Sequence, residues 1–306
     1  MNVDTKIVVL AGASGNLGSR IANALLDKPG VTLRALVRSG SRQKVASLSE
    51  RGAEIVEGDL QGADGSEVLS KAMTGAFSVV SALQGGAHVL IDVQVRLLEA
   101  AKRAGVRRFI PSDFSFNMFG VADGENIATD MRRSFARHAD QARGSVEVVH
   151  ILNGCFLDRG VLFGFLGAID LASGKAFLWG DGKAKMDFTT YDDTARFAAE
   201  AAVDPGPVPA EFNVAGDTLD FHELVQAYKD ASGKPLTVVQ MGSIDDIDAE
   251  ISSRRQAKPH NIFGFLPLMY WRAMLSGKGK LGPLVNAHYA HIHPLTVRDY
   301  VTREGL

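Results

Sequence analysis

The sequence contains a single cysteine, Cys155, among its 306 residues. An internal disulfide is therefore excluded, and this low cysteine content fits a reducing compartment. Long hydrophobic runs are also missing, since no stretch of about 18 uncharged apolar residues occurs, and this excludes a transmembrane helix. Near the N-terminus, no basic region precedes an apolar run of the length that a signal peptide requires. We therefore expect a cytoplasmic protein that does not associate with membranes.

Neither sign of charge dominates the sequence. The 33 Lys and Arg residues face 35 Asp and Glu residues, which leaves a net charge of −2. A dedicated nucleic-acid binder carries a basic surplus, so we expect no direct binding to nucleic acid. Hydrophobic residues make up 46% of the chain, which excludes a disordered or collagen-like protein and permits a well-buried core.

The first half of the chain alternates between strand and helix patterns. Short apolar runs predict strands at residues 6–10, 32–37, 55–56, 77–81, 109–110 and 146–152. Helical periodicity separates them, at residues 16–26, 41–48, 66–73 and 89–104. This alternation predicts an α/β fold, a Rossmann-type doubly wound parallel sheet.

The alternation of strand and helix patterns becomes less regular after residue 153. Strands are predicted at 176–179, 186–189 and 236–240, and helices at 192–202, 221–232 and 244–256. Thr190 and Asp193 resemble a capping box for the first of these helices. We predict a dinucleotide-binding domain over residues 1–153 and a smaller α/β substrate lobe over residues 154–306, with some elements returning to the main sheet.

The most informative motif is the glycine-rich loop over residues 12–18, GASGNLG. It follows a predicted strand and begins a predicted helix, which is the context that a dinucleotide-binding loop requires. Gly12 permits a tight turn, Gly15 allows backbone N–H groups to approach a pyrophosphate, and Gly18 lets the helix lie close to the sheet. The loop residues expected to contact a cofactor are Gly12, Ser14, Gly15, Asn16, Leu17 and Gly18.

Arg38 lies where the second strand ends, at the position where an NAD-binding protein carries an acidic residue. A guanidinium there suits the 2′-phosphate of NADP(H), although a solvated surface arginine is the alternative. By topology, Asp59 and Leu60 are placed near the adenine, and Ala82 and Gln84 near the nicotinamide. Two later residues are expected to line the nicotinamide as well, Asn153 and Phe156.

Together with the glycine loop, several segments resemble the NmrA-like and isoflavone-reductase-like atypical short-chain dehydrogenases. These are residues 36–38 (LVR), 58–60 (GDL), 108–114 (RFIPSDF), 153–156 (NGCF), 180–182 (GDG), 192–195 (DDTA) and 212–214 (FNV). The resemblance implies an NADPH-binding fold with a C-terminal substrate lobe. The family includes reductases of plant phenylpropanoids, quinone reductases and catalytically silent NADP sensors.

The sequence departs from this family at the proton donor. The reductase branch uses a lysine whose position falls near Ala128, and no lysine occurs between Lys102 and Lys175. The other short-chain solution, Tyr-x-x-x-Lys, is also absent. Reduction of an isolated ketone gains roughly 10²–10⁴-fold from a positioned acid, whereas a quinone yields a delocalised phenolate that hydrogen-bond donors can stabilise.

The sequence therefore predicts an NADPH-dependent oxidoreductase acting on a small aromatic, quinone-like or enone substrate. The alternative is a catalytically silent NADP(H)-sensing regulator, and either form could be a homodimer or bind a protein partner. No catalytic residue is identified. His138 is a weak candidate for a substitute acid, and a solvated helix histidine is the alternative.

The remaining candidates favour structural roles. Asp130, Arg132 and Arg133 are expected to form a charged outer face, and Cys155 is expected to be a small buried hydrophobe. His288, His291 and His293 lack an accompanying ligand, so no metal site is predicted. Several aromatic residues form either the wall of an apolar substrate pocket or ordinary core: Phe156, Phe163, Phe165, Trp179, Tyr270 and Trp271.

Overall fold

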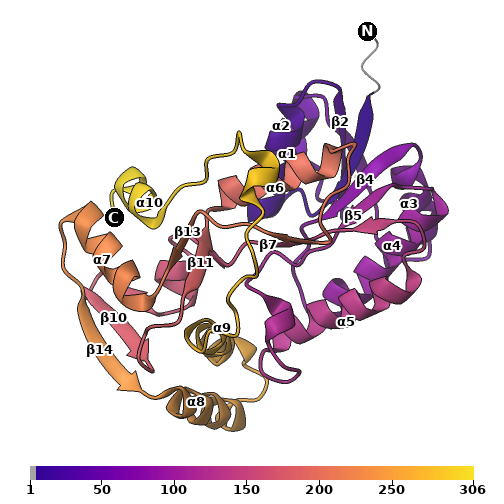
Figure 1. The fold of residues 1–306 in the computed structure, drawn as a ribbon. Helices are drawn as coiled ribbons and strands as arrows, with labels where there is room; N and C mark the ends of the chain where they lie inside the picture. Colours follow the sequence, from indigo (N-terminus) through magenta and orange to yellow (C-terminus); the bar gives the residue numbers. More distant parts are fainter. Residues whose placement is uncertain (1–4) are drawn as a thin grey trace. The chain divides into compact units, whose positions relative to one another are not determined.

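A six-stranded sheet organises the N-terminal part of the computed structural model, which describes residues 5–306. All of its strands are parallel, in the order β3-β2-β1-β4-β5-β6. The strands are β1 (Lys6–Ala11), β2 (Val31–Val37), β3 (Glu54–Glu57), β4 (Ala76–Ser81), β5 (Arg108–Ile110) and β6 (Glu147–Val148). This strand order reverses between β1 and β4, so the predicted Rossmann-type α/β fold is confirmed (Figure 1).

Helices connect these strands and cover the sheet. They are α1 (Asn16–Leu26), η1 (Arg42–Val45), α2 (Ala46–Glu50), α3 (Gly65–Met73), η2 (His88–Val93), α4 (Gln94–Arg103) and α5 (Ile127–Ala142). Because both faces are covered, the central strand β1 is apolar after Lys6, and Val8, Val9 and Leu10 are fully buried. The predicted helix over residues 89–104 begins as a turn of π-helix, η2, before it continues as α4.

The strand predicted at residues 146–152 is divided in two. β6 pairs with β5, and Val149 still donates a hydrogen bond to the Phe109 carbonyl. The next amide, that of His150, instead donates to the Ala210 carbonyl. β7 (His150–Leu152) therefore leaves the main sheet and pairs with β12 (Glu211–Asn213).

The rest of the chain forms small sheets and helices. One sheet has the order β14-β10-β9 and another the order β13-β11-β8. Their strands are β8 (Cys155–Phe156), β9 (Ile169–Asp170), β10 (Lys175–Trp179), β11 (Met186–Thr189), β13 (Asp217–Leu219) and β14 (Thr237–Gly242). The helical elements are η3 (Met118–Gly120), η4 (Val161–Phe165), α6 (Tyr191–Val203), α7 (Phe221–Ser232), α8 (Ile244–Ala257), η5 (Ile262–Gly264), α9 (Leu266–Leu275), η6 (Asn286–Tyr289) and α10 (Val297–Glu304).

The chain divides into two compact units, each assembled from three segments. The first contains the residues up to Asp113, Met131–Ile151 and Thr194–Phe212. The second contains Phe114–Asp130, Leu152–Asp193 and Asn213–Leu306, and its core includes Phe188, Phe221, Phe265 and Trp271. The chain therefore passes from one unit to the other several times, and the domain boundary at residue 153 stays a prediction.

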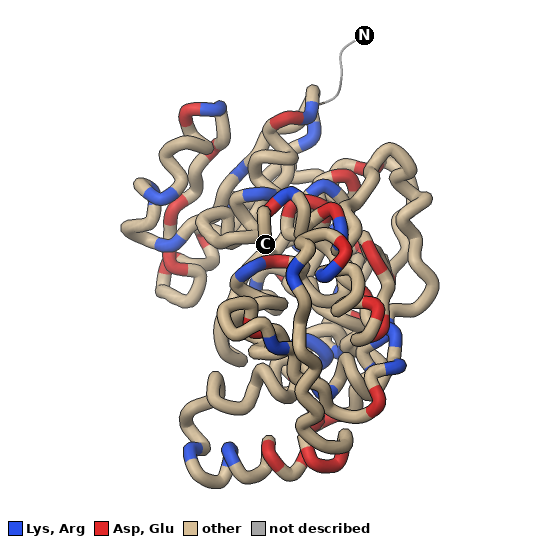
Figure 2. The backbone as a smooth tube through the Cα atoms, turned by 90° about the vertical axis from the view of Figure 1, so that its left-hand side faces the viewer, with Lys and Arg blue, Asp and Glu red and all other residues tan. Residues whose placement is uncertain are grey.

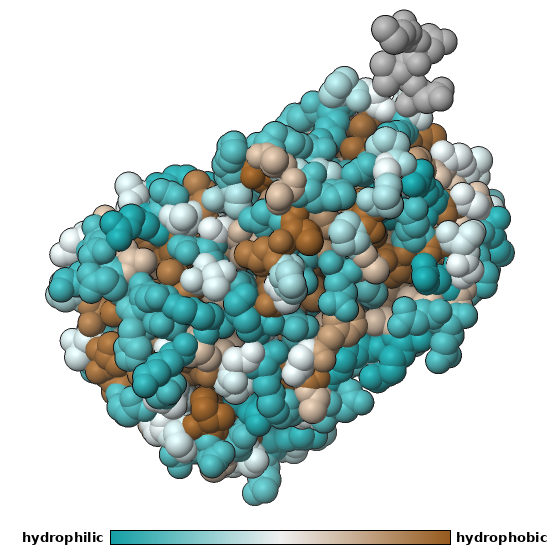
Figure 3. Space-filling model, in the orientation of Figure 1, coloured by the Kyte–Doolittle hydropathy of each residue, from teal (hydrophilic) through white to brown (hydrophobic). Residues whose placement is uncertain are grey.

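Charged and apolar residues are mixed along the surface. Lys and Arg are interspersed with Asp and Glu over the tube in Figure 2, as expected from the near-neutral net charge. On the face drawn in Figure 3, hydrophobic residues lie in small groups among hydrophilic ones. Within residues 5–306, none of the helices has the length and apolar character needed to cross a membrane.

Candidate functional site

The glycine loop connects the carboxyl end of β1 to α1. Gly12 has a φ of 91°, and a Cβ atom at this position would lie 2.7 Å from the Ala82 carbonyl oxygen. A Cβ atom at Gly18 would lie 2.0 Å from the Gly12 carbonyl oxygen. Side chains are therefore excluded at both positions, by the turn and by the close approach of the helix to the loop.

The N-terminus of α1 is open for an anion. Gly15 is the N-cap residue, so no side chain caps the first turn, which also contains no acidic residue. Ser14 and Asn16 are exposed beside it, and Leu17 is half-buried. Uncapped N–H groups and the positive end of the helix dipole together favour the binding of an anion such as a phosphate.

Arg38 follows directly after β2, and its side chain is exposed. Its backbone carbonyl accepts a hydrogen bond from Ser41 and so closes a turn, while Gly40 donates to the Glu57 carboxylate. In the part of the chain that the structure describes, the Arg38 guanidinium has no carboxylate partner. It is therefore available to a bound anion.

Two further loops leave the same edge of the sheet. Asp59 is exposed after β3 and accepts a hydrogen bond from the Gln61 amide, while Leu60 is buried. After β4, Ala82 donates to the Ala11 carbonyl and Gln84 is exposed. The carboxyl ends of parallel strands meet at one edge of a sheet, so these loops lie with the glycine loop, where open α/β sheets bind ligands.

A buried polar group follows β5, in the segment 108–114 that carries part of the family resemblance, and the sequence analysis predicted no role for it. The Ser112 amide donates to Gln94 Oε1 and its hydroxyl to the Leu83 carbonyl, both at 2.7 Å. Asp113 Oδ2 lies 2.6 Å from His150 Nδ1, and both side chains are buried. Burial lowers the pKa of His150, but the hydrogen bond and negative charge of Asp113 outweigh it and raise the pKa above its usual value.

Asn153 and Phe156 belong to the second unit. Asn153 is fully buried, and its amide donates to the Ser115 carbonyl at 2.9 Å. Among the described residues, neither polar atom of its carboxamide has a hydrogen-bond partner. Phe156 stacks on Tyr191 with ring centroids 4.0 Å apart, and both rings are half-buried. A buried carboxamide and a stacked aromatic ring thus follow β7.

Helix α5 differs in part from the expectation. Arg132 and Arg133 are buried, so the predicted charged outer face is wrong for them, and Arg132 donates to the Ser112 carbonyl. His138 is half-buried, with no hydrogen-bond partner for its Nε2 among the described residues. Ala128 is buried near the start of α5, where the resemblance would place a lysine.

Cys155 and the remaining aromatic candidates lie in the core of the second unit or pack against it. Cys155 is buried, and burial raises the pKa of its thiol to about 12. Trp179 and Trp271 lie in the core of the second unit, whereas Phe163, Phe165 and Tyr270 are half-buried against it. In residues 5–306, no group of three or more His, Cys, Asp or Glu side chains is arranged to hold a metal ion.

Comparison with known proteins shows which proteins this chain is similar to. Residues 4–127 match the NmrA-like family model. The chain is 28% identical to pinoresinol reductase 1 of Arabidopsis thaliana over 254 residues, which span 78% of each protein. It is 26% identical to bifunctional pinoresinol-lariciresinol reductase 2 of Thuja plicata over 314 residues, which span 97% of each.

Solved structures of similar fold match nearly the whole chain. A structure of AtPrR2 with NADP+ and (+)pinoresinol has a TM-score of 0.80 and 25% sequence identity, and the match covers 98% of each chain. The crystal structure of isoflavone reductase has a TM-score of 0.82 and 20% identity, covering 98% of this chain and 99% of the other. The second likeness bears on the fold alone.

Proposed function

Because the chain belongs to the NmrA-like and isoflavone-reductase-like atypical short-chain dehydrogenase/reductase family, we propose that it is an NADPH-dependent oxidoreductase. Its relatives are named as reductases of aromatic compounds, which supports oxidoreductase function at the level of the family. The proposed substrate is a small aromatic, quinone-like or enone molecule.

The residues at the carboxyl edge of the sheet fit a dinucleotide. The observation that carries the proposal is the close packing at Gly12 and Gly18, where a Cβ atom would clash with a backbone carbonyl oxygen, together with the uncapped first turn of α1. In this assignment the loop amides hold the pyrophosphate, and Asp59 and Leu60 lie near the adenine. Ala82, Gln84, Asn153 and Phe156 are assigned to the nicotinamide side.

Arg38 is the basis for proposing NADPH rather than NADH. Its exposed guanidinium has five N–H donors in a planar fork, which matches the oxygens of a 2′-phosphate. An acidic residue at the same place would repel that phosphate. AtPrR2, for which a structure with NADP+ exists, is 25% identical to this chain and supports the same choice.

The chemistry of the site favours a conjugated acceptor. When bound, NADPH supplies the hydride, and the protein orients the reactants and stabilises the charge that develops on the acceptor. Neither family solution for a proton donor is encoded, so an acceptor whose oxyanion is delocalised suits the site best. Half-buried aromatic rings of the second unit, including Phe165 and Tyr270 at 5.9 Å between centroids, suit an aromatic substrate.

The test is consumption of NADPH, followed by its absorbance, with a panel of quinones, enones and phenylpropanoids. Parallel reactions contain NADH. Many turnovers with one acceptor class and a clear preference for NADPH are the expected result. Firm binding of NADPH without turnover across the whole panel would contradict the proposal and favour an NADP(H)-sensing regulator. A cytoplasmic location and association with a second copy or a protein partner stay predictions.

A further inference from the structure

The turn over residues 38–41 begins at Arg38 and lies entirely within the first unit. The Ser41 amide donates a hydrogen bond to the Arg38 carbonyl at 2.9 Å and closes the turn. Gly40, at the third position, has a φ of 75°, whereas Ser39 does not have a positive φ. This combination is typical of a type II turn, in which the central peptide is reversed relative to a type I turn. The conformation of the turn therefore depends on the direction in which the Gly40 N–H points.

Packing does not fix the direction of this peptide. Residues 38–40 are exposed, and a Cβ atom at Gly40 would meet no heavy atom within 4 Å apart from those of its chain neighbours. Glycine also adopts positive and negative φ about equally well, so the turn by itself leaves both directions accessible. A contact from outside the turn is therefore what selects one of them.

That contact comes from the neighbouring strand, β3. The Gly40 amide donates a hydrogen bond to Glu57 Oε1 at 2.6 Å. Glu57 is the last residue of β3 and is paired with Val37 on β2, and the Gly58 amide donates to the Val37 carbonyl at 3.0 Å. The main sheet thus holds the backbone of Glu57 beside the turn. Reversal of the central peptide would turn the Gly40 N–H away and lose a charge-assisted hydrogen bond.

The Glu57 carboxylate acts on the backbone of the turn and leaves the Arg38 side chain unpaired. In the described part of the chain, the Arg38 guanidinium forms no ion pair with Glu57 or with another carboxylate. Glu57 therefore does not neutralise the group that is assigned to the 2′-phosphate. It holds the turn in one conformation before a ligand arrives, which lowers the entropy that binding must cost.

We propose that Glu57 is a positioning residue for the 2′-phosphate site, and that it supports the preference for NADPH by holding residues 38–41 in their binding conformation. The assignment rests on the proposed function, in which Arg38 contacts the 2′-phosphate. In this assignment Glu57 does not contact the phosphate, because two anions would repel each other. Its effect passes through the Gly40 amide, so NADH, which lacks the 2′-phosphate, should be insensitive to it.

The alternative is that Glu57 acts on the 2′-phosphate only through its negative charge, in which case removing that charge would strengthen binding. Glu57→Ala removes both the charge and the hydrogen-bond acceptor, whereas Glu57→Gln removes the charge and keeps a carbonyl acceptor for the Gly40 amide. Glu50→Ala is the matched control. Glu50 is exposed at the end of α2, in the same connection between β2 and β3, and has no ion-pair partner among the described residues.

The experiment is calorimetric titration of the full chain with 2′,5′-ADP and with 5′-AMP, two adenosine nucleotides that differ by the 2′-phosphate. We expect Glu57→Ala to bind 2′,5′-ADP about tenfold more weakly than the wild-type protein does, and to bind 5′-AMP equally well. Glu57→Gln should stay within about threefold of the wild-type affinity for both nucleotides, and Glu50→Ala should match it. Titration with NADPH and NADH should give the same pattern.

A double-mutant cycle tests whether the effect passes through Arg38. In Arg38→Gln the phosphate has lost its guanidinium, so the position of the turn matters less. Adding Glu57→Ala to this variant should weaken the binding of 2′,5′-ADP by less than about threefold, because the two residues act as one unit. A tenfold loss in both backgrounds would show that Glu57 acts independently of Arg38, and would overturn the proposal.

The outcomes separate this inference from the proposed function. If NADPH binds and no acceptor is reduced, the oxidoreductase function fails, while the nucleotide titrations still decide the role of Glu57. If the wild-type protein does not prefer 2′,5′-ADP over 5′-AMP, the 2′-phosphate site and the role of Glu57 fail together.

Three results would overturn the role of Glu57 alone. The first is a preference for 2′,5′-ADP that Glu57→Ala keeps within about threefold. The second is stronger binding of 2′,5′-ADP by both Glu57 variants, which simple charge repulsion predicts. The third is an equal loss of affinity for 2′,5′-ADP and 5′-AMP in Glu57→Ala, which a general disturbance of the fold would cause.

Discussion

At the scale of single residues, Arg38 is the residue that we propose determines the preference between NADPH and NADH. Arg38→Glu replaces a cation by an anion at the proposed 2′-phosphate site. Loss of charge-assisted hydrogen bonds, worth about 1.5–3 kcal/mol, and the added repulsion should weaken NADPH binding by roughly 30-fold or more. Binding of NADH should change little. Titration of both cofactors by fluorescence checks this expectation.

The matched control for Arg38→Glu is Arg103→Glu. Arg103 is exposed in the last turn of α4, which leads to the amino end of β5, so it lies at the opposite edge of the sheet. This variant changes the net charge by the same amount and should bind both cofactors normally. Equal losses of NADPH and NADH affinity in Arg38→Glu would remove Arg38 from the 2′-phosphate site.

The pair of His150 and Asp113 makes stability depend on pH. The folded protein holds the pKa of His150 above its usual 6.5, despite the opposing effect of burial, through the hydrogen bond and charge of Asp113. Because the folded state binds this proton more tightly than the unfolded state, the stabilisation is complete below about pH 6.5. It should be lost as the pH rises through the folded pKa. Urea denaturation across this pH range measures the slope.

His150→Gln should remove that pH dependence and lower the free energy of unfolding by about 3 kcal/mol, since it leaves a buried carboxylate without its partner. His260→Gln is the control, because His260 is exposed. A wild-type unfolding free energy that rises with pH across this range would show that the pair does not favour the protonated histidine.

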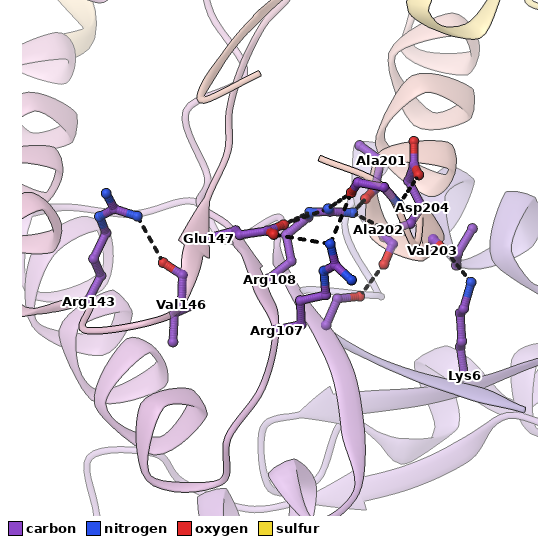
Figure 4. Close-up of polar contacts among 12 residues, drawn as sticks. Lys6, Arg107, Arg108, Arg143, Val146, Glu147, Ala201, Ala202, Val203 and Asp204 are labelled. Carbon is purple, nitrogen blue, oxygen red and sulfur yellow. Dashed lines mark hydrogen bonds and ion pairs between the residues drawn. The ribbon is translucent and has the colours of Figure 1, made fainter. Parts of the chain in front are cut away.

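At the scale of helices and strands, Arg108 fixes the C-terminal end of α6 to the main sheet. Its side chain is fully buried and donates to Glu147 Oε2 at 2.6 Å. It also donates to the carbonyls of Ala201, Asp204 and Gly206 at 2.5 to 2.8 Å (Figure 4). One guanidinium thus satisfies carbonyls at the end of a helix, where no intrahelical donor is available.

Arg108→Met should therefore lower the free energy of unfolding by about 3–5 kcal/mol, because Glu147 and the carbonyls lose their donor. The neighbouring Arg107 is the matched control. It contacts Glu147 and the Gly206 carbonyl, both at 3.3 Å, but its side chain is 40% exposed. Arg107→Met should cost less than about 1 kcal/mol. Similar urea midpoints for the two variants would contradict the role given to Arg108.

At the scale of the whole molecule, sequence patterns predicted those parts of the fold that depend on residues close together in the chain. The alternation of apolar runs and helical periodicity predicted all six strands of the main sheet, and the glycine loop was recognised because turn, strand and helix are adjacent in sequence. Arg38 could be placed because it directly follows a strand.

The features that the sequence did not predict depend on contacts between residues that are far apart in the chain. The His150–Asp113 pair spans 37 residues, and the Asp187–Lys280 contact spans 93. No periodicity links such positions, so only the packed chain brings them together. The division of residues 146–152 into β6 and β7 likewise depends on a distant acceptor, the Ala210 carbonyl.

The first unit includes a segment that lies far along the chain from its other residues. Residues 194–212 belong to the first unit, although they lie beyond the predicted boundary at residue 153. Their carbonyls accept hydrogen bonds from Lys6, from the buried Ser78 hydroxyl and from Arg108.

A fragment of residues 1–153 loses all of these partners and leaves Arg108 buried without its carbonyl acceptors, which is strongly unfavourable. We expect this fragment to show no cooperative urea transition by circular dichroism, whereas the full chain shows one. A sharp transition in the 1–153 fragment would mean that the sheet folds without α6 and β12.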